Sequence, residues 1–217
     1  MHLFFDLDGT LTDSRAGILN CMRHALAVMG LPVPADHALL RFIGPPTHEA
    51  FPELLGSSDP ELNARAIAVY RERFAKLGMF ENSLYPGIIE GLSALLDAGF
   101  PMLVVTSKPE VFAEQIIDHF ELRKFFGRVY GSELTGERGN KGELLAHVLA
   151  NERLSSADAW MIGDRLHDIR GAKRNGLRAA GVLWGYGDHE ELMQAGADAT
   201  FASMPELVRQ FVADSGT

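Results

Sequence analysis

The clearest fold signal in this chain is the segment Leu3–Thr12, which reads LFFDLDGTLT. Its run of bulky apolar residues predicts a short buried strand, and Gly9 gives the backbone the freedom to turn sharply after that strand. Asp6 and Asp8 therefore lie at the carboxyl end of a strand. In open parallel α/β sheets, the loops at that end converge on a crevice in which ligands bind.

The carboxylates of Asp6 and Asp8 stand one residue apart, and their charges predict a metal site. Anionic groups held close together raise each other's pKa unless a cation joins them, so we expect a divalent cation. Hard oxygen ligands suit Mg²⁺. One carboxylate can then attack phosphorus to form an aspartyl-phosphate, while its neighbour moves a proton to and from the leaving group. An isolated Asp-x-Asp pair is more simply explained as two acids that cap a turn, so this interpretation depends on the rest of the chain.

A second predicted strand, Pro101–Val105, also ends in groups that suit a phosphate. It leads into Thr106, Ser107 and Lys108, which offer a hydroxyl and turn amides to phosphate oxygens. Pro109 then opens a predicted helix. Two interpretations of Lys108 stay open, because its ammonium group either reaches the phosphate or substrate or lies in solvent at the edge of the sheet.

Lys141 and the segment Gly163–Asp168 complete the pattern. Lys141 stands just before a helical pattern of apolar residues, where its charge can neutralise a nucleophile and a phosphate together. The apolar run Trp160–Ile162 predicts a third strand, and Asp164 and Asp168 follow at its carboxyl end. We expect these two acids to complete an oxygen-rich metal site.

In this order, the motifs D-x-D-G-T, T-S, K and G-D-x-x-x-D resemble those of the haloacid dehalogenase superfamily, and its phosphatases in particular. The resemblance covers nearly the whole chain and implies a Mg²⁺-dependent phosphatase that acts on a small phosphate ester. It implies catalysis by Asp6, Asp8 and Lys141; binding of phosphate or substrate by Gly9, Thr106, Ser107, Lys108 and Lys141; and metal binding by Asp6, Asp164, Asp168 and the backbone carbonyl of Asp8.

The residues around the motifs resemble those of the superfamily branch that contains phosphoglycolate phosphatases and 5′-nucleotidase-like enzymes. The segments Phe42–Pro46 (FIGPP) and Leu183–Gly187 (LWGYG) favour the nucleotidase-like side. A phosphomutase would use the same aspartates, and a non-catalytic phospho-acceptor domain is a further alternative. A dehalogenase is disfavoured, because that chemistry does without the second acid of the first motif, which is present here as Asp8.

Helical patterns fill the interval between the first two strands, which is too long for a single crossover connection. A first helix starts at its N-cap, Ser14, and ends near Gly30. Two more helical stretches follow, near Thr47–Leu55 and from Pro60 to about Lys76. We therefore interpret residues 14–83 as an inserted α-helical cap, which in the resembled family closes over the active site.

The remaining chain alternates strands and helices, which predicts a Rossmann-like, doubly wound parallel sheet formed by residues 1–13 and 84–217. Beyond the strands already named, we expect helices at Ile88–Leu96, Val111–Phe120, Glu190–Ala195 and Pro205–Val212, and strands near Val129, at Ala179–Leu183 and near Thr200–Phe201.

Composition is compatible with this interpretation. The chain has 217 residues, 47% of them hydrophobic, which is enough for one large domain or a core with an insertion. The formal charge of −9 argues against a nucleic-acid polymer as partner. Apolar runs are too short for a signal peptide or for the roughly 20 residues of a membrane span. With Cys21 as the single cysteine, no intrachain disulfide can form, and we expect a cytoplasmic protein.

Several other residues have more than one interpretation. His167 lies between two proposed metal ligands, but its position more simply shapes the loop. For Arg165 we expect a salt bridge that orients Asp164 or Asp168 rather than contact with the substrate. In the inserted helices, the Gly-Pro-Pro turn either presents Arg41, Thr47 or His48 to the substrate or acts only as a stiff connector.

Overall fold

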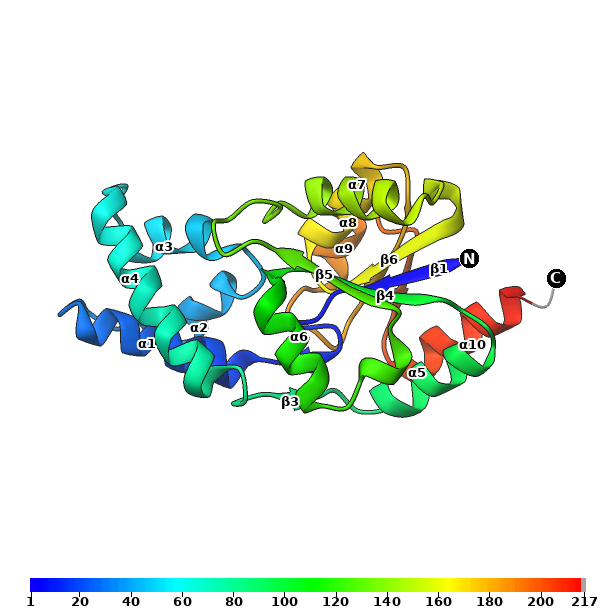
Figure 1. The fold of residues 1–217 in the computed structure, drawn as a ribbon, viewed down its shortest axis with the longest axis horizontal. Helices are drawn as coiled ribbons and strands as arrows, with labels where there is room; N and C mark the ends of the chain where they lie inside the picture. The colour runs from blue at the N-terminus through cyan, green and yellow to red at the C-terminus, as the bar shows by residue number, and fades with distance from the viewer. Residues whose placement is uncertain (216–217) are drawn as a thin grey trace. The chain divides into compact units, whose positions relative to one another are not determined.

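The computed structural model describes residues 1–215, which fold into two compact units. The larger unit consists of Met1–Thr12 and the chain from Leu84 onward, and the smaller one is Asp13–Ser83. The chain passes between the units twice, at the short strands β2 (Thr12–Asp13) and β3 (Ser83–Leu84), which pair with each other. Figure 1 shows the course of the chain.

A six-stranded parallel sheet forms the centre of the larger unit, in the order β5-β4-β1-β6-β7-β8. Its strands are β1 (His2–Phe5), β4 (Met102–Pro109), β5 (Arg128–Ser132), β6 (Ala159–Gly163), β7 (Arg178–Val182) and β8 (Ala199–Phe201). The chain starts at the centre, builds outward through β4 and β5, and then returns to add β6, β7 and β8 on the other side. This is the doubly wound topology that the alternating pattern predicted.

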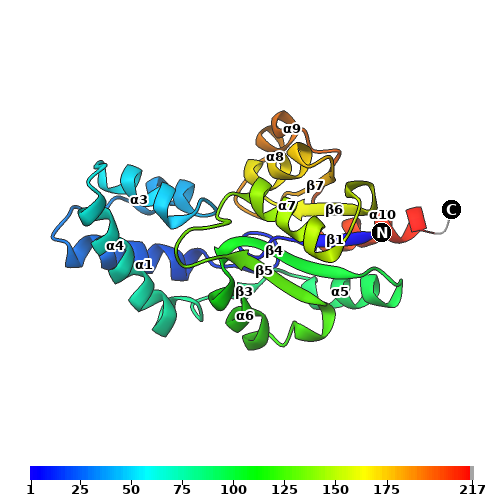
Figure 2. The same ribbon diagram turned by 45° about the horizontal axis from the view of Figure 1, so that its top comes forward.

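Helices cover both faces of this sheet. Figures 1 and 2 show α7, α8 and α9 on one face and α5, α6 and α10 on the other. Their bounds are α5 (Ile88–Asp97), α6 (Glu110–His119), α7 (Lys141–Glu152), α8 (Leu166–Arg174), α9 (His189–Ala195) and α10 (Met204–Ser215). Because both faces are covered, the strands read as continuous apolar runs, and Phe4 in the central strand is fully buried.

The register of the central strands brings their carboxyl ends to one level. Phe5 pairs with Val104 of β4 on one side and with Ile162 of β6 on the other. The amide of Asp6 continues this ladder by donating to the carbonyl of Ile162 at 2.9 Å. The residues that follow these strands therefore meet at one edge of the sheet.

The smaller unit is built from helices: α1 (Arg15–Val28), α2 (Asp36–Leu39), α3 (Thr47–Leu55) and α4 (Pro60–Arg73), with a 3₁₀ turn at Leu40–Phe42 and a π-helical turn at Phe74–Gly78. Aromatic rings join α3 to α4, since Phe51 meets Tyr70 edge to face and Tyr70 stacks on Phe74. Ser14 occupies the N-cap position of α1, but its side chain makes no capping hydrogen bond.

A partly buried polar cluster lies inside the smaller unit. Arg73 donates to both carboxylate oxygens of Glu81, at 2.8 and 2.9 Å, and its Nη1 also lies 3.2 Å from the sulfur of Cys21. Cys21 is fully buried and forms no disulfide. Beside it α1 approaches the π-helical turn so closely that a Cβ on Gly17 would lie 1.9 Å from the carbonyl oxygen of Gly78.

The predicted helices and strands are confirmed, with small shifts at their ends. The helix predicted from Pro60 to Lys76 is α-helical only to Arg73, where the π-helical turn begins. The short helix α2 was not predicted, because four residues are too few to show a helical period. No helix within residues 1–215 is both long enough and apolar enough to cross a bilayer.

Candidate active site

The turn after β1 carries Asp6 into the sheet edge and packs against the segment after β6. Gly9 has a φ of 82°, a conformation that side chains rarely adopt, and a Cβ there would lie 2.1 Å from a carboxylate oxygen of Asp164. The neighbouring hydroxyl of Thr10 donates to the other oxygen of Asp164 at 3.3 Å. The Gly-Thr pair of the first motif therefore packs directly against Asp164, although Thr10 and Asp164 are 154 residues apart in the chain.

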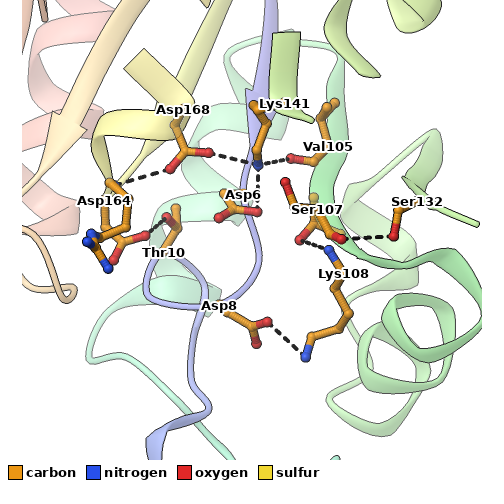
Figure 3. A network of polar contacts seen from close by, with 12 residues as sticks. Asp6, Asp8, Thr10, Val105, Ser107, Lys108, Ser132, Lys141, Asp164 and Asp168 are labelled. Atoms are coloured by element: carbon orange, nitrogen blue, oxygen red, sulfur yellow. Dashed lines mark hydrogen bonds and ion pairs between the residues drawn. The ribbon is translucent and has the colours of Figure 1, made fainter. Parts of the chain in front are cut away.

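Lys141, the first residue of α7, joins three of the predicted segments (Figure 3). Its Nζ lies 2.9 Å from Oδ1 of Asp6, 2.8 Å from Oδ1 of Asp168 and 2.9 Å from the carbonyl oxygen of Val105. Burial works to lower the pKa of Lys141, but the carboxylates of Asp168 and Asp6 outweigh it and raise that pKa to about 12. Lys141 is therefore a fixed positive charge at the carboxyl end of β1.

Asp168 lies in the first turn of α8, where both of its carboxylate oxygens are engaged. Oδ1 pairs with Lys141, and Oδ2 accepts a hydrogen bond from the backbone amide of Arg165 at 3.2 Å. Burial raises the pKa of Asp168, Lys141 opposes this, and Asp6 adds to it, so that the pKa is about 6. Asp168 thus ties the lysine to the start of α8.

Asp164 occupies the opposite side of the cluster and is fully buried. Its Oδ2 accepts from the amide of Tyr186 at 2.8 Å, in addition to the Thr10 contact at Oδ1. Burial, followed by repulsion from Asp168 and Asp6, raises the pKa of Asp164 well above its usual range. No lysine or arginine ion pair to Asp164 occurs in the described part of the chain, so its charge is poorly compensated.

The donor set of this cluster suits a hard divalent cation. Asp6, Asp164 and Asp168 each offer a carboxylate oxygen, and these atoms lie within 4.8 Å of one another. Three buried carboxylates with a single lysine leave a net negative charge, and the raised pKa of Asp164 shows the energetic cost. All-oxygen donors favour Mg²⁺ over softer metals. Among the described residues His167 is not a member of this group.

Asp8 and Lys108 form a separate ion pair at the same edge. Nζ of Lys108 lies 2.8 Å from Oδ2 of Asp8, and the two side chains are only 6% and 12% exposed. Oδ1 of Asp8 is buried and has no hydrogen-bond partner. Of the two interpretations of Lys108, the structure therefore excludes a solvent-exposed position, and it keeps the carboxylate of Asp8 apart from the metal-ligand group.

Thr106 and Ser107 follow Val105 directly, and because Lys141 contacts both Val105 and Asp6, these residues lie close to Asp6. Thr106 is buried, and its Oγ1 accepts from the backbone amide of Lys108 at 3.3 Å. The carbonyl of Ser107 accepts from the hydroxyl of Ser132, at the end of β5, at 2.9 Å. Figure 3 shows this network together with the lysine and the acids.

The structure corrects the prediction for Arg165. Its guanidinium forms its ion pair with Glu191 at 2.8 Å, and its backbone amide donates to Asp168. Glu191 lies in α9, and its Oε1 also accepts from the amide of Leu166. Glu191 therefore lies outside the G-D-x-x-x-D motif, so the motif alone gave no sign of this ion pair.

Sequence reasoning also missed the role of the segment after β7. Tyr186 donates its amide to Asp164, and the indole of Trp184 donates to the carbonyl of Thr10 at 2.9 Å. A Cβ on Gly185 would lie 2.3 Å from the Cβ of Asp164. The glycines of Leu183–Gly187 were a usable signal, because a backbone that approaches another segment so closely requires them.

Within the smaller unit, two of the three residues considered for substrate contact have partners of their own. Arg41 forms an exposed ion pair with Glu53 at 2.8 Å, and Thr47 accepts from Arg71 at 3.4 Å. His48 lies 3.8 Å from Glu49. These contacts are consistent with a stiff connector, and they do not test whether the three residues contact a substrate.

Comparisons of the sequence and the structure with known proteins identify the family to which the chain belongs. The family model of haloacid dehalogenase-like hydrolases matches residues 3–182, so the chain belongs to this family of enzymes. It is 44% identical to a protein named 5′-nucleotidase from Pseudomonas aeruginosa over 191 residues, which are 88% of this chain and 86% of that relative. A solved structure of a predicted phosphatase from Clostridium acetobutylicum superposes with a TM-score of 0.93, at 40% identity over 98% of both chains.

A further relative is named for a different activity. The chain is 42% identical to the tyrosine-protein kinase PtkA of Mycobacterium tuberculosis over 186 residues, which are 85% of this chain but only 62% of that protein. The family membership confirms the resemblance drawn from the motifs.

Proposed function

We propose that this protein is a Mg²⁺-dependent phosphomonoester hydrolase that acts on a small phosphorylated metabolite. The observation that carries the proposal is the position of Asp6, whose Oδ1 is held 2.9 Å from Lys141 in a buried cluster with Asp164 and Asp168. Such a carboxylate is oriented by the lysine and its charge is offset by that cation, which suits a nucleophile. We further propose a covalent aspartyl-phosphate on Asp6.

In the first step, the free carboxylate oxygen of Asp6 attacks phosphorus in line, and the bond from phosphorus to the leaving oxygen breaks. Asp8 donates a proton to that leaving oxygen, which departs as an alcohol. In the second step, Asp8 takes a proton from water, the water oxygen bonds to phosphorus, and the bond from Asp6 to phosphorus breaks. Inorganic phosphate leaves, and both acids return to their starting states.

The remaining residues hold and neutralise the phosphoryl group. Lys141 is a permanent cation beside the nucleophile, and Thr106 and the amide of Ser107 offer donors to phosphoryl oxygens. Asp6, Asp164 and the carbonyl of Asp8 would hold Mg²⁺, with Asp168 assisting. When bound, the ion supplies positive charge that offsets the phosphoryl oxygens and the acids.

In this proposal the inserted helices of residues 14–83 act as the cap of the resembled family, excluding bulk water during transfer and selecting the substrate. The net charge of −9 disfavours a nucleic-acid polymer as substrate, whereas the local cations Lys108 and Lys141 accept a small phosphate ester. The 5′-nucleotidase relative and the segments FIGPP and LWGYG favour nucleoside 5′-monophosphates, with phosphoglycolate as the alternative. The thiol of Cys21 is buried and forms no disulfide, which is consistent with the cytoplasm.

The test is phosphate release from a panel of nucleoside 5′-monophosphates, phosphoglycolate and sugar phosphates, with Mg²⁺ and after chelation. We expect turnover that chelation abolishes, and Asp6→Asn should be inactive while its circular dichroism stays unchanged. Asp8→Asn should slow both steps. Release of phosphate at a near-native rate by Asp6→Asn would refute the covalent route, and isomerised product without free phosphate would identify a phosphomutase.

A second candidate function is phosphoryl transfer to protein tyrosine, which the identity to PtkA favours. The same preparation, incubated with labelled ATP and a tyrosine-containing peptide, separates the two candidates. Hydrolysis predicts labelled inorganic phosphate without labelled peptide. Stable phosphotyrosine that depends on Asp6 would favour the kinase instead.

A further inference from the structure

The segment that carries Thr106 and Ser107 lies where the sheet ladder opens. The pairing of β4 with β5 runs regularly to Val105 and Tyr130 and resumes at Pro109 and Ser132, with a shift of register between them. Backbone groups between these points lose their regular ladder partners. Buried groups of this kind need other partners, so the residues that supply them set the local geometry.

Side chains hold this open stretch at two carbonyls. The carbonyl of Val105 accepts from Lys141 at 2.9 Å, and the carbonyl of Ser107 accepts from the hydroxyl of Ser132 at 2.9 Å. Lys141 belongs to the charge network described above. Ser132 carries no charge and belongs to none of the family motifs, yet it is only 5% exposed.

The peptide unit between Ser107 and Lys108 is held from both sides. Its carbonyl oxygen receives the hydroxyl of Ser132, while its amide nitrogen donates to Oγ1 of Thr106 at 3.3 Å. A planar peptide that is fixed at both polar ends cannot rotate about its long axis without breaking one of the bonds. Because Oγ1 of Thr106 accepts from that amide, its own proton is left to donate to another group.

The position of Ser132 is itself fixed by close packing. A Cβ on the preceding Gly131 would lie 2.5 Å from the Cα of Glu110, so that the backbones of β5 and the start of α6 are in direct contact. The amide of Gly131 also donates to the carboxylate of Glu110 at 3.2 Å. Close packing thus holds the end of β5, from which the hydroxyl of Ser132 donates to the carbonyl of Ser107 (Figure 3).

We propose that Ser132 is a positioning residue for phosphate binding, which acts by holding the Ser107–Lys108 peptide so that Thr106 and Ser107 aim their donors at the phosphoryl group. This inference rests on the proposed function. Ser132 touches neither the acids nor Lys141 through any described contact, so its effect passes through the peptide alone.

The experiment compares Ser132→Ala with Ser155→Ala, using the substrate that the panel identifies. Ser155 is the control, because its hydroxyl also bonds to the backbone, accepting from the amide of Ala157 at 3.3 Å, but it is exposed and caps the short turn Ser156–Asp158 that precedes β6, away from the carboxyl edge of the sheet. We expect Ser132→Ala to lower kcat/KM by about tenfold or more, since small misplacements of binding groups have effects of this size. KM and the inhibition constant of inorganic phosphate should rise in parallel, while Ser155→Ala stays at the wild-type values.

A double-mutant cycle with Thr106→Ala identifies the route of the effect. If Ser132 acts through the peptide that Thr106 also holds, Ser132→Ala should cost far less in the Thr106→Ala background than in the wild type. Ser132→Thr keeps the donor and should recover most of the lost kcat/KM. Full additivity, or a loss in Ser132→Thr equal to that in Ser132→Ala, would overturn the inference.

Failure of this inference can be told apart from failure of the proposed function. If the wild type hydrolyses a phosphate ester and Thr106→Ala is impaired while Ser132→Ala is not, the positioning role is wrong and the proposed function stands. If the wild type releases phosphate from no member of the panel, the proposed function fails before Ser132 is tested. A fall in melting temperature for Ser132→Ala without any change in kcat/KM would also contradict the inference.

Discussion

The carboxylate cluster has two ends that differ in how their charge is balanced. At one end Asp6 and Asp168 share Lys141 at 2.9 and 2.8 Å. At the other, Asp164 is equally buried but has only a hydroxyl and a backbone amide, and its pKa is raised well above its usual range by burial and by Asp168 and Asp6. The protein supplies its own cation at Asp6 and Asp168, and in the proposed function an external cation would balance the charge at Asp164.

The largest effect is expected at the lysine end. Lys141→Met removes a buried cation from two carboxylates, and breaking such a pair costs about 3–5 kcal/mol of unfolding free energy. Phosphatase activity should be lost as well, because the charge beside Asp6 disappears. Urea unfolding at pH 7 measures the stability.

Lys173→Met is the matched control for that prediction. It removes a more exposed pair with Asp198, whose side chains are both 35% exposed, and the expected loss is below about 1 kcal/mol. Equal losses in the two variants would mean that burial does not distinguish Lys141.

The acid end is expected to respond to metal. Mg²⁺ at ten times its dissociation constant should stabilise the wild type by about 1.4 kcal/mol, because it binds only the folded state. Asp164→Asn should lose this stabilisation, whereas Asp97→Asn, which changes an exposed acid at the end of α5, should keep it. Thermal unfolding with and without Mg²⁺ measures the difference. An Asp164→Asn protein that Mg²⁺ stabilises as much as the wild type would place the metal elsewhere.

The pH dependence of stability in the metal-free protein tests the environment of Asp168. The pKa of Asp168 rises from 3.8 to about 6, so the folded state holds a proton that the unfolded state has released. That contribution to stability is complete below pH 3.8 and is lost as the pH rises through about 6. Urea unfolding in EDTA should therefore show a steeper fall over this range in the wild type than in Asp168→Asn, and parallel curves would contradict the assignment.

The smallest effect is expected where the cluster meets α9. Glu191→Gln removes the ion pair with Arg165 but keeps an acceptor for the amide of Leu166. Because the two side chains are partly exposed, the loss of stability should stay within about 1 kcal/mol and kcat/KM should change little. A large fall in kcat/KM would instead support direct contact of Arg165 with the substrate.

Sequence reasoning reached the residues that local patterns mark. Apolar runs located β1, β4 and β6, and acids or hydroxyls directly after such runs had to meet at one edge of a parallel sheet. Asp6, Asp164 and Asp168 were identified in this way, and Lys141 was identified by its place just before a helical pattern of apolar residues. Their roles in catalysis and metal binding remain proposals that the variants above examine.

The partners of these residues were beyond the reach of such patterns. Arg165 forms an ion pair with Glu191, and Trp184 donates a hydrogen bond to Thr10. The sequence spacing of these residues indicates neither contact. Ser132 ends a strand like any other serine, and its importance depends on a shift of register between β4 and β5. Such contacts depend on how neighbouring elements pack, which a single sequence does not specify.

The burial of Cys21 gives the smaller unit an intrinsic probe of local unfolding. Because it is the only cysteine in the sequence and is fully buried, a thiol reagent can reach it only when the helices around it open. The rate of labelling in the native protein therefore measures how often that unit unfolds locally. A cysteine introduced elsewhere on the surface would react at once, so a fluorescent dye can be attached there without removing the native thiol.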